Sequence, residues 1–143
     1  MPLLDEKVQA QVRKTLEGMT GPVKLVVFTQ TDECEFCAET HALVEEIAAL
    51  APPEKLGVQT YDFVADKAAV EAYQVDKIPA LALIGAKDYG IRYYGIPSGY
   101  EFSSLMDDIL TISKGESGLM AATKAAVAKI TKPVHIQVYV TPT

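Results

Sequence analysis

Residues 23–37 read Val23-Lys24-Leu25-Val26-Val27-Phe28-Thr29-Gln30-Thr31-Asp32-Glu33-Cys34-Glu35-Phe36-Cys37. The first six form a short β-branched and aromatic run, which is typical of a buried strand. Polar residues suited to a loop follow, and the apolar stripe after them predicts a helix from about Cys34 to Leu50, ended by Pro52 and Pro53. The stretch therefore places a Cys-x-x-Cys pair where a buried strand turns into a helix.

A Cys-x-x-Cys pair in this position is suited to thiol–disulfide exchange. At a helix N-terminus, unpaired N–H groups and the positive end of the helix dipole favour the thiolate form of the first cysteine. The second cysteine, three residues on, lies on the same side of the first turn and is expected to be more buried. We therefore predict that Cys34 is the nucleophile and that Cys37 resolves the mixed disulfide.

Acidic residues around the pair act against the reactivity of Cys34. Asp32, Glu33, Glu35 and Glu39 bring like charge to the site. Negative charge disfavours a thiolate and opposes the helix dipole. We expect the pKa of Cys34 to be less depressed than in strongly oxidising Cys-x-x-Cys proteins, and the redox couple to be correspondingly more reducing.

A zinc site and inert core thiols are the alternatives for the two cysteines. A closed zinc site needs four ligands, and the chain has two histidines, His41 and His135. We expect His41 on the helix that begins at Cys34, and His135 lies about a hundred residues further on. A metal bridging two chains also stays open. We favour exchange chemistry with no metal and no cofactor, and we interpret His41 as a groove or surface residue rather than a base.

Composition and charge exclude several classes of protein. The chain has 143 residues, of which 49% are hydrophobic and 22% charged, so it can bury the core of one globular domain. A net charge of −6 argues against binding to nucleic acid, which requires basic residues. Charged residues interrupt residues 1–20, and no apolar run approaches the roughly 20 residues of a membrane span. We expect a cytoplasmic protein without nucleic-acid or membrane partners.

The remaining sequence patterns predict alternating helices and strands. Strands joined through a helix are expected to be parallel, and strands joined by a tight turn antiparallel. The predicted fold class is therefore α/β, a central mixed four-stranded sheet flanked by helices, with an extra N-terminal helix. Besides the stretch above, helices are expected over residues 5–18, 65–73 and 101–113, and strands over 58–63, 80–84 and 89–94.

The C-terminal part of the chain repeats the pattern that precedes Cys34. A helix is expected over residues 116–129, and the stretch Lys132-Pro133-Val134-His135-Ile136-Gln137-Val138-Tyr139-Val140-Thr141 echoes residues 21–30. We predict a redox unit over residues 1–113, followed at 114–143 by a linker helix and the first strand of a truncated second unit. The alternative is a chance likeness between two helix-then-strand stretches.

The strand leading into Cys-x-x-Cys, followed by Ile78-Pro79 at the start of a later strand, resembles the thioredoxin superfamily. The extra leading helix, residues 28–37 and residues 95–102 look like the first glutaredoxin-like unit of the two-unit protein disulfide oxidoreductases. Residues 138–143 look like the strand that leads into the second unit of such proteins. This resemblance implies a thioredoxin-like fold for the redox unit.

The resemblance also implies how substrate is held. In the superfamily the proline is cis and lies against the active-site disulfide, and the backbone before it pairs with substrate like an added strand. By this likeness Pro79 is cis, and Ile78 presents its N–H and C=O to substrate. We expect Glu35 and Phe36, the pair between the cysteines, to contact substrate as well.

The chain departs from the family pattern at several positions. The pair between the cysteines is Glu-Phe rather than Pro-Tyr or Gly-Pro, and no tryptophan precedes Cys34. Phe28 stands where thioredoxins carry a buried carboxylate, six residues before Cys34, so proton transfer to Cys37 is weak or comes from elsewhere. Gly95 is followed by Ile96-Pro97 rather than by the double glycine of glutathione-binding relatives, which argues against a glutathione-specific role.

The resemblance predicts a thiol–disulfide oxidoreductase that acts on protein disulfides, takes electrons from a donor like thioredoxin reductase, and is a monomer or weak dimer. The alternatives are a redox-inert docking or electron-relay domain of a larger reductase, and a dimer bridged by metal through the Cys-x-x-Cys.

Overall fold

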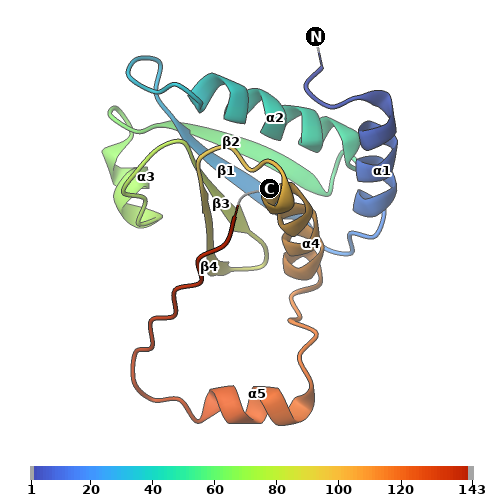
Figure 1. Cartoon of the computed structure of the whole chain (residues 1–143), viewed down its shortest axis with the longest axis vertical. Coiled ribbons are helices and arrows are strands. Elements are labelled where there is room, and N and C mark those ends of the chain that lie inside the picture. Colours follow the sequence, from blue (N-terminus) through green and yellow to red (C-terminus); the bar gives the residue numbers. More distant parts are fainter. Residues whose placement is uncertain (1, 142–143) are drawn as a thin grey trace.

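Four strands form a single sheet at the centre of the molecule, and helices cover both of its faces (Figure 1). The computed structural model describes residues 2–141. Its elements, in chain order, are α1 (Glu6–Leu16), β1 (Val23–Thr29), α2 (Cys37–Leu50), β2 (Leu56–Asp62), α3 (Lys67–Ala72), β3 (Ala80–Ile84), β4 (Asp88–Tyr94), α4 (Tyr100–Lys114) and α5 (Ala121–Ala128).

The sheet is mixed, as the sequence predicts. The strand order is β2-β1-β3-β4. β1 runs parallel to β2, to which α2 connects it, whereas β3 pairs antiparallel with both β1 and β4. The predicted α/β class and the extra N-terminal helix are both confirmed. Among residues 2–141, no helix is both long and apolar enough to cross a membrane.

The central strands β1 and β3 are buried on both faces, which explains their continuous apolar sequences. Successive side chains of a strand point to opposite sides. Leu25 and Val27 therefore pack toward α1, α2 and α4, while Val26 and Phe28 pack toward the side of α3. The two apolar clusters hold the helical layers onto the sheet and fix the end of β1 that leads to the cysteines.

Helix α2 begins later than the sequence predicts. Its first helical residue is Cys37 rather than Cys34, and Phe36 is the N-cap without a side-chain capping bond. Glu33 has a φ of 56° in the left-handed region, and the chain turns through residues 35–36 before the helix starts. Cys34 thus lies in a turn ahead of the helix. The direct helix-dipole effect on Cys34 is correspondingly weaker than predicted, because that effect falls off within the first turn.

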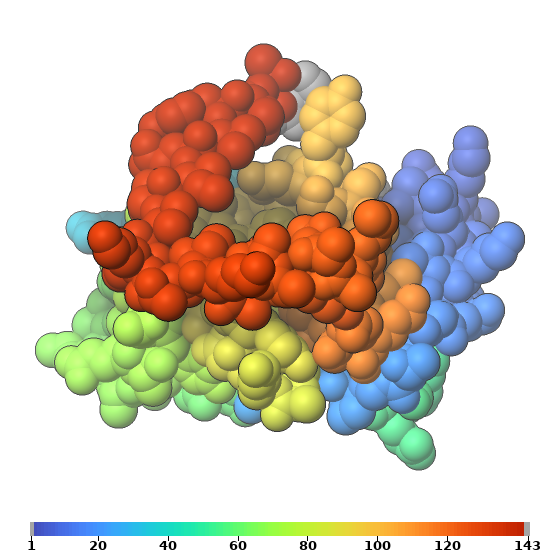
Figure 2. All heavy atoms as spheres, turned by 90° about the horizontal axis from the view of Figure 1, so that it is seen from below, coloured from blue at the N-terminus to red at the C-terminus, as the bar shows by residue number. Residues whose placement is uncertain are grey.

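In the C-terminal region the secondary structure of the described residues differs from the predicted one, while the assignment of a second unit there stays a prediction. The helix there, α5, is shorter than predicted and buries no residue, and no strand forms over residues 132–141. Apolar side chains at alternate positions stay in solvent: Val134, Ile136, Val138 and Val140 are 65–81% exposed. A strand needs a partner for its backbone groups, and within residues 2–141 no strand pairs with this segment. Figure 2 shows the segment arching off one face of the molecule.

The buried hydroxyl of Ser113 ties the end of α4 to the loop between α1 and β1. It accepts hydrogen bonds from the backbone N–H of Thr20 at 2.9 Å and of Gly21 at 3.0 Å, and donates one to the carbonyl of Gly21 at 2.6 Å. A Cβ at position 21 would lie 2.8 Å from the carbonyl oxygen of Ser113. Only glycine allows this approach.

Replacing this hydroxyl is expected to destabilise the protein. Ser113→Ala removes the acceptor of the Thr20 N–H and the donor to the Gly21 carbonyl, while the Gly21 N–H keeps the Ser113 carbonyl at 3.1 Å, so we expect the free energy of unfolding to fall by about 1–2 kcal/mol. Urea denaturation measures the change. Ser104→Ala, on the exposed face of the same helix, serves as the matched control and should shift stability by less than about 0.5 kcal/mol. Equal effects of the two substitutions would disprove the anchoring role.

Candidate functional site

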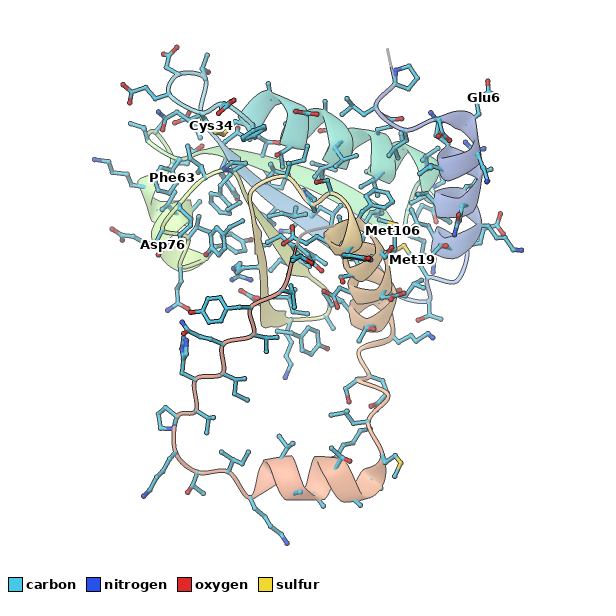
Figure 3. All side chains as sticks on the ribbon, viewed as in Figure 1. Glu6, Met19, Cys34, Phe63, Asp76 and Met106 are labelled. Atoms are coloured by element: carbon cyan, nitrogen blue, oxygen red, sulfur yellow. A yellow bond between two sulfur atoms is a disulfide. The ribbon has the colours of Figure 1, made fainter. Side chains whose placement is uncertain are left out.

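The two cysteines lie at the end of β1 and the start of α2 and are joined as a disulfide. Their Cα atoms are 5.5 Å apart. Cys34 is half-buried in the turn, and Cys37 on the first turn of α2 is 2% exposed. The side-chain view shows Cys34 at the edge of the molecule, where the loop meets α2 (Figure 3). An incoming sulfur atom can thus reach Cys34 more easily than Cys37.

A shallow cavity of about 270 Å³ opens over the disulfide. It is bounded by the end of β1 and the loop after it, by the first turns of α2, and by the end of β2. This places both sulfur-bearing residues on the wall of one hollow. Its lining residues are Thr29, Gln30, Thr31, Cys34, Cys37, Ala38, His41 and Asp62.

Ile78 and Pro79 lie at the same end of the sheet as the cysteines. The peptide bond between them is cis. Phe28 pairs with Ala80 in the sheet, so Pro79 comes next to the point where β1 leaves for Cys34. The carbonyl of Pro79 accepts from the N–H of Gly95 at 2.9 Å. Within residues 2–141, the backbone N–H and C=O of Ile78 have no hydrogen-bond partner, so both groups are available to an added strand.

The other two predicted substrate contacts, Glu35 and Phe36, are exposed beside the disulfide rather than inside the cavity. Phe36 is 45% exposed. Neither residue lines the cavity, and neither do Ile78 and Pro79. The structure brings all six predicted site residues to one end of the sheet, but only the cysteines share the hollow.

Phe28 is fully buried beneath the site. Its ring stacks on Tyr61 with centroids 5.6 Å apart and meets the edge of Tyr73 at the same distance. The aromatic cluster fills the place of the carboxylate found in thioredoxins. No acidic side chain stands at this position that could transfer a proton to or from Cys37.

His41 belongs to the site, although the sequence reading assigns it no part in the chemistry. It lies one turn after Cys37 on α2, and its Nε2 is 3.1 Å from the hydroxyl of Thr60 on β2 and 3.4 Å from a carboxylate oxygen of Glu45. Thr60 and Asp62 on β2 were not among the predicted site residues. No local signal could find them, because they reach the site only through the parallel pairing of β1 and β2.

The charges at the two sides of the disulfide differ. On the side of the cysteines, Asp32, Glu33 and Glu35 are exposed and have no basic partner within the described part of the chain. On the side of Pro79, the ammonium group of Lys77 bonds Asp76 at 3.0 Å and lies 4.6 Å from the centre of the Tyr94 ring. The hydrogen bond to Asp76 raises the pKa of Lys77. The charged side chains next to Cys34 in the loop are therefore all acidic.

No group of three or more histidine, cysteine or acidic side chains within residues 2–141 is arranged to hold a metal ion. His135 lies on the exposed C-terminal segment. The structure therefore does not bring the two histidines to the cysteine pair as one ligand set.

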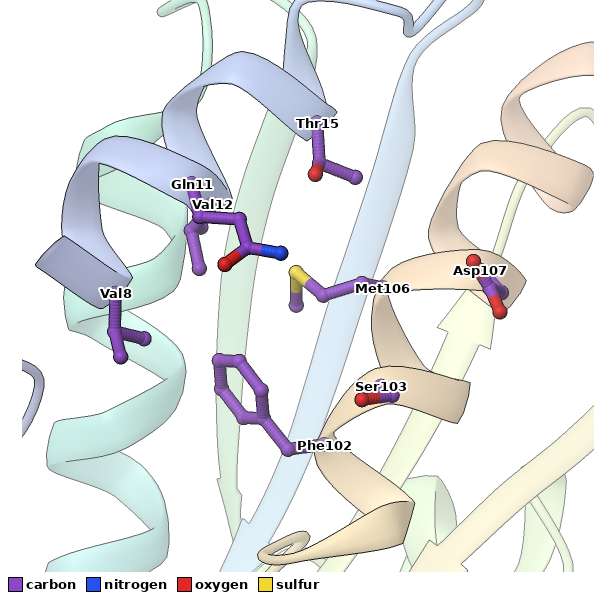
Figure 4. A pocket seen from close by; sticks show the side chains of 8 residues that line it. All are labelled: Val8, Gln11, Val12, Thr15, Phe102, Ser103, Met106 and Asp107. Atoms are coloured by element: carbon purple, nitrogen blue, oxygen red, sulfur yellow. The ribbon is translucent and has the colours of Figure 1, made fainter.

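A second hollow lies between α1 and α4, away from the disulfide (Figure 4). Most of the residues that line it are uncharged, and four of them are apolar. Phe102 and Met106 of α4 face Val8 and Val12 of α1. It contains no cysteine or histidine. The chemistry of the chain is concentrated at the other site.

Comparison with known proteins supports the thioredoxin-like fold. A protein disulfide oxidoreductase from Aeropyrum pernix K1 superposes with a TM-score of 0.78 at 30% sequence identity, over 89% of this chain and 56% of that chain. The NTD_N/C domain of the alkylhydroperoxide reductase AhpF from Enterococcus faecalis (V583) gives 0.77 at 25% identity, over 87% and 59%. The chain belongs to the thioredoxin superfamily. Its Cys-x-x-Cys disulfide on this fold supports thiol–disulfide oxidoreductase chemistry in general.

Sequence comparison adds one curated relative. The NADH dehydrogenase of Bacillus subtilis (strain 168) is 24% identical over an alignment of 143 residues that covers 99% of this chain and 25% of that protein. No protein-family model matches. This thioredoxin-superfamily chain thus spans a quarter of the curated relative and less than two thirds of either solved chain.

Removing the acidic charge beside Cys34 is expected to make the thiol of this superfamily member more acidic. In a Cys37→Ser background only Cys34 titrates, and the double change Glu33→Gln and Glu35→Gln should lower the pKa of Cys34 by about 0.3–1 unit, since each exposed charge contributes a few tenths of a kcal/mol or more. The ultraviolet absorbance of the thiolate measures the shift.

Glu54→Gln, at the opposite end of the sheet near Val23, removes one charge far from Cys34 and is the control. It should leave the titration unchanged. High salt should shrink the effect of the double change, because it screens exposed charges. A Cys34 pKa that does not move in the double variant would show that the acidic residues do not control the thiol.

Proposed function

We propose that this chain is a dithiol oxidoreductase that reduces disulfides in proteins. The observation that carries the proposal is the unequal burial of two bonded cysteines, with half-buried Cys34 and buried Cys37 on one cavity wall. In such a pair, the more accessible cysteine can attack the substrate disulfide and the buried one can resolve the mixed disulfide. The unpartnered backbone of Ile78 beside the pair supports an extended polypeptide as substrate.

The reaction proceeds in two exchange steps. The Cys34 thiolate attacks one sulfur of the substrate disulfide, forms a mixed disulfide and releases the other substrate sulfur as a thiolate. The Cys37 thiolate then attacks the Sγ of Cys34, which forms the Cys34–Cys37 disulfide and releases the second substrate thiolate. Two protons complete the substrate dithiol. The protein loses two electrons, and the substrate disulfide gains them.

We further propose that the electrons come from a reductase and that the chain transfers them onward. The likeness to the N-terminal domain of AhpF, whose name describes an alkylhydroperoxide reductase, supports this role, as does the likeness to a protein named NADH dehydrogenase. The acidic surface beside Cys34 favours partners with basic residues around their own sulfur atoms. A cytoplasmic location and a monomeric or weakly dimeric state belong to the same proposal.

The division of the chain into a redox unit and the start of a second unit is also proposed. The alternating apolar side chains over residues 134–140 support it, since they would be buried if that segment joined a sheet. This chain covers 56% and 59% of the two longer solved chains, which is consistent with such an arrangement.

Insulin reduction tests the enzymatic proposal. The wild-type chain, kept reduced by dithiothreitol, should precipitate the insulin B chain faster than dithiothreitol alone. A rate equal to dithiothreitol alone would favour the competing role as a docking domain with inert cysteines. Purified protein that contains metal and loses its dimer on chelation would favour the metal-bridged alternative.

A further inference from the structure

Thr40 on α2 has a buried hydroxyl that the fold does not use. The residue is 0% exposed, and its Oγ1 has no hydrogen-bond partner among residues 2–141. A buried hydroxyl without a partner destabilises a protein by about 1–3 kcal/mol. Such groups are rare in native proteins and call for an explanation, of which a redox role is one.

The position of Thr40 connects its hydroxyl with Cys37. The two residues are three apart on α2, so their side chains lie on the same face one turn apart. Both point into the core, where Cys37 is 2% exposed. In the disulfide-bonded structure the sulfur of Cys37 is uncharged and does not require a hydrogen-bond donor.

Reduction of the disulfide gives Cys37 a thiol that can ionise. A buried thiolate loses its hydration, and burial raises the pKa of a thiol unless a donor stabilises the charged form. The resolving step requires Cys37 as a thiolate. The place of the thioredoxin carboxylate is filled by Phe28, whose ring packs on Tyr61 and Tyr73 and offers no polar atom.

We propose that Thr40 is a positioning residue for Cys37, whose hydroxyl donates a hydrogen bond to the sulfur of Cys37 once the disulfide is reduced. The inference rests on the proposed function in that it gives Cys37 the resolving role. The hydroxyl has no partner in the disulfide form because its partner exists only in the dithiol form.

The proposal predicts opposite consequences in the two redox states. Thr40→Val keeps the shape of the side chain and removes an unsatisfied polar group, so the disulfide form should be as stable as wild type or more stable. The dithiol form loses a donor to a charged sulfur. A purely structural role for the hydroxyl would instead destabilise both forms alike.

Titration of Cys37 as the sole thiol is the direct test. In a Cys34→Ser background, Thr40→Val should raise the pKa of Cys37 enough to reduce the thiolate fraction about tenfold at a pH below that pKa. Thr40→Ser, which restores the hydroxyl, should return the titration to that of the background. Thr40→Ala also lacks the hydroxyl and should repeat the rise, which covers a folding defect in the valine variant. Titrations that are identical with and without the hydroxyl would overturn the proposal.

Redox equilibrium of the two-cysteine protein provides a second readout. Against a dithiothreitol buffer, Thr40→Val should shift the equilibrium toward the disulfide by up to about tenfold at a pH where the Cys37 thiolate is populated, and Thr40→Ser should not. An unmoved equilibrium would contradict the proposal even if the unfolding midpoint changed. Neither measurement requires turnover of a protein substrate. A chain that fails to reduce insulin but shows these shifts would disprove the proposed function and leave the role of Thr40 intact.

Discussion

Cys34→Ser is expected to reduce the rate of insulin reduction to that of dithiothreitol alone, because it removes the half-buried sulfur that attacks the substrate. Cys37→Ser is expected to abolish turnover in a different way. Cys34 can still attack, but the buried partner that resolves the mixed disulfide is absent. This variant should therefore accumulate a covalent adduct with its substrate, which non-reducing electrophoresis and mass spectrometry detect.

The two serine variants control for each other. Both lack the same cross-link between residues 34 and 37, so any loss of stability from the missing disulfide is common to both. A trapped adduct in Cys37→Ser alone would establish the order of attack. If both variants kept the wild-type rate, the cysteines would be spectators and the docking-domain alternative would be favoured. Adducts trapped only through Cys37 would reverse the assigned roles.

Phe28→Ala is expected to be the most destabilising substitution beneath the site. The ring is fully buried and contacts Tyr61 and Tyr73, both at 5.6 Å between centroids. Deleting a buried phenylalanine ring typically costs about 3–5 kcal/mol, since the lost apolar contacts leave a cavity. This is a large part of the 5–15 kcal/mol that stabilises an ordinary domain. Urea denaturation of the oxidised protein measures the loss.

Phe36→Ala removes the same side chain from the surface and is the matched control. Its ring is 45% exposed beside the disulfide, so its loss should change the free energy of unfolding by less than about 0.5 kcal/mol. A Phe28→Ala variant as stable as Phe36→Ala would show that the aromatic cluster does not hold the β1 end in place.

The comparisons and the geometry support the same chemistry at different levels of detail. Likeness to the disulfide oxidoreductase of Aeropyrum pernix K1 and to the AhpF domain covers nearly nine tenths of this chain. The geometry adds three features that the comparisons do not address, namely the acidic surface at Cys34, the buried ring of Phe28 and the unpartnered hydroxyl of Thr40. We expect these features to influence the acidity of the two thiols, which the titrations described above measure.

Local sequence was enough to predict the elements that make the site. The continuous apolar run of β1 predicts a strand buried on both faces, and the apolar spacing after Cys37 predicts α2, because both signals depend on neighbours along the chain. The Cys-x-x-Cys predicts its own disulfide, since three residues of separation at a helix start bring the sulfur atoms together. The start of α2 was misplaced because a left-handed residue, Glu33, delays it.

Tertiary structure alone decided which distant residues meet. His41 on α2 meets Thr60 on β2, nineteen residues on, only because α2 packs against the sheet in which β2 pairs with β1. The isolation of the Thr40 hydroxyl depends on every side chain packed around α2, which no pattern along the chain encodes. Residues 132–141 carry the pattern of a strand but form none, because a strand exists only where a second strand satisfies its backbone groups.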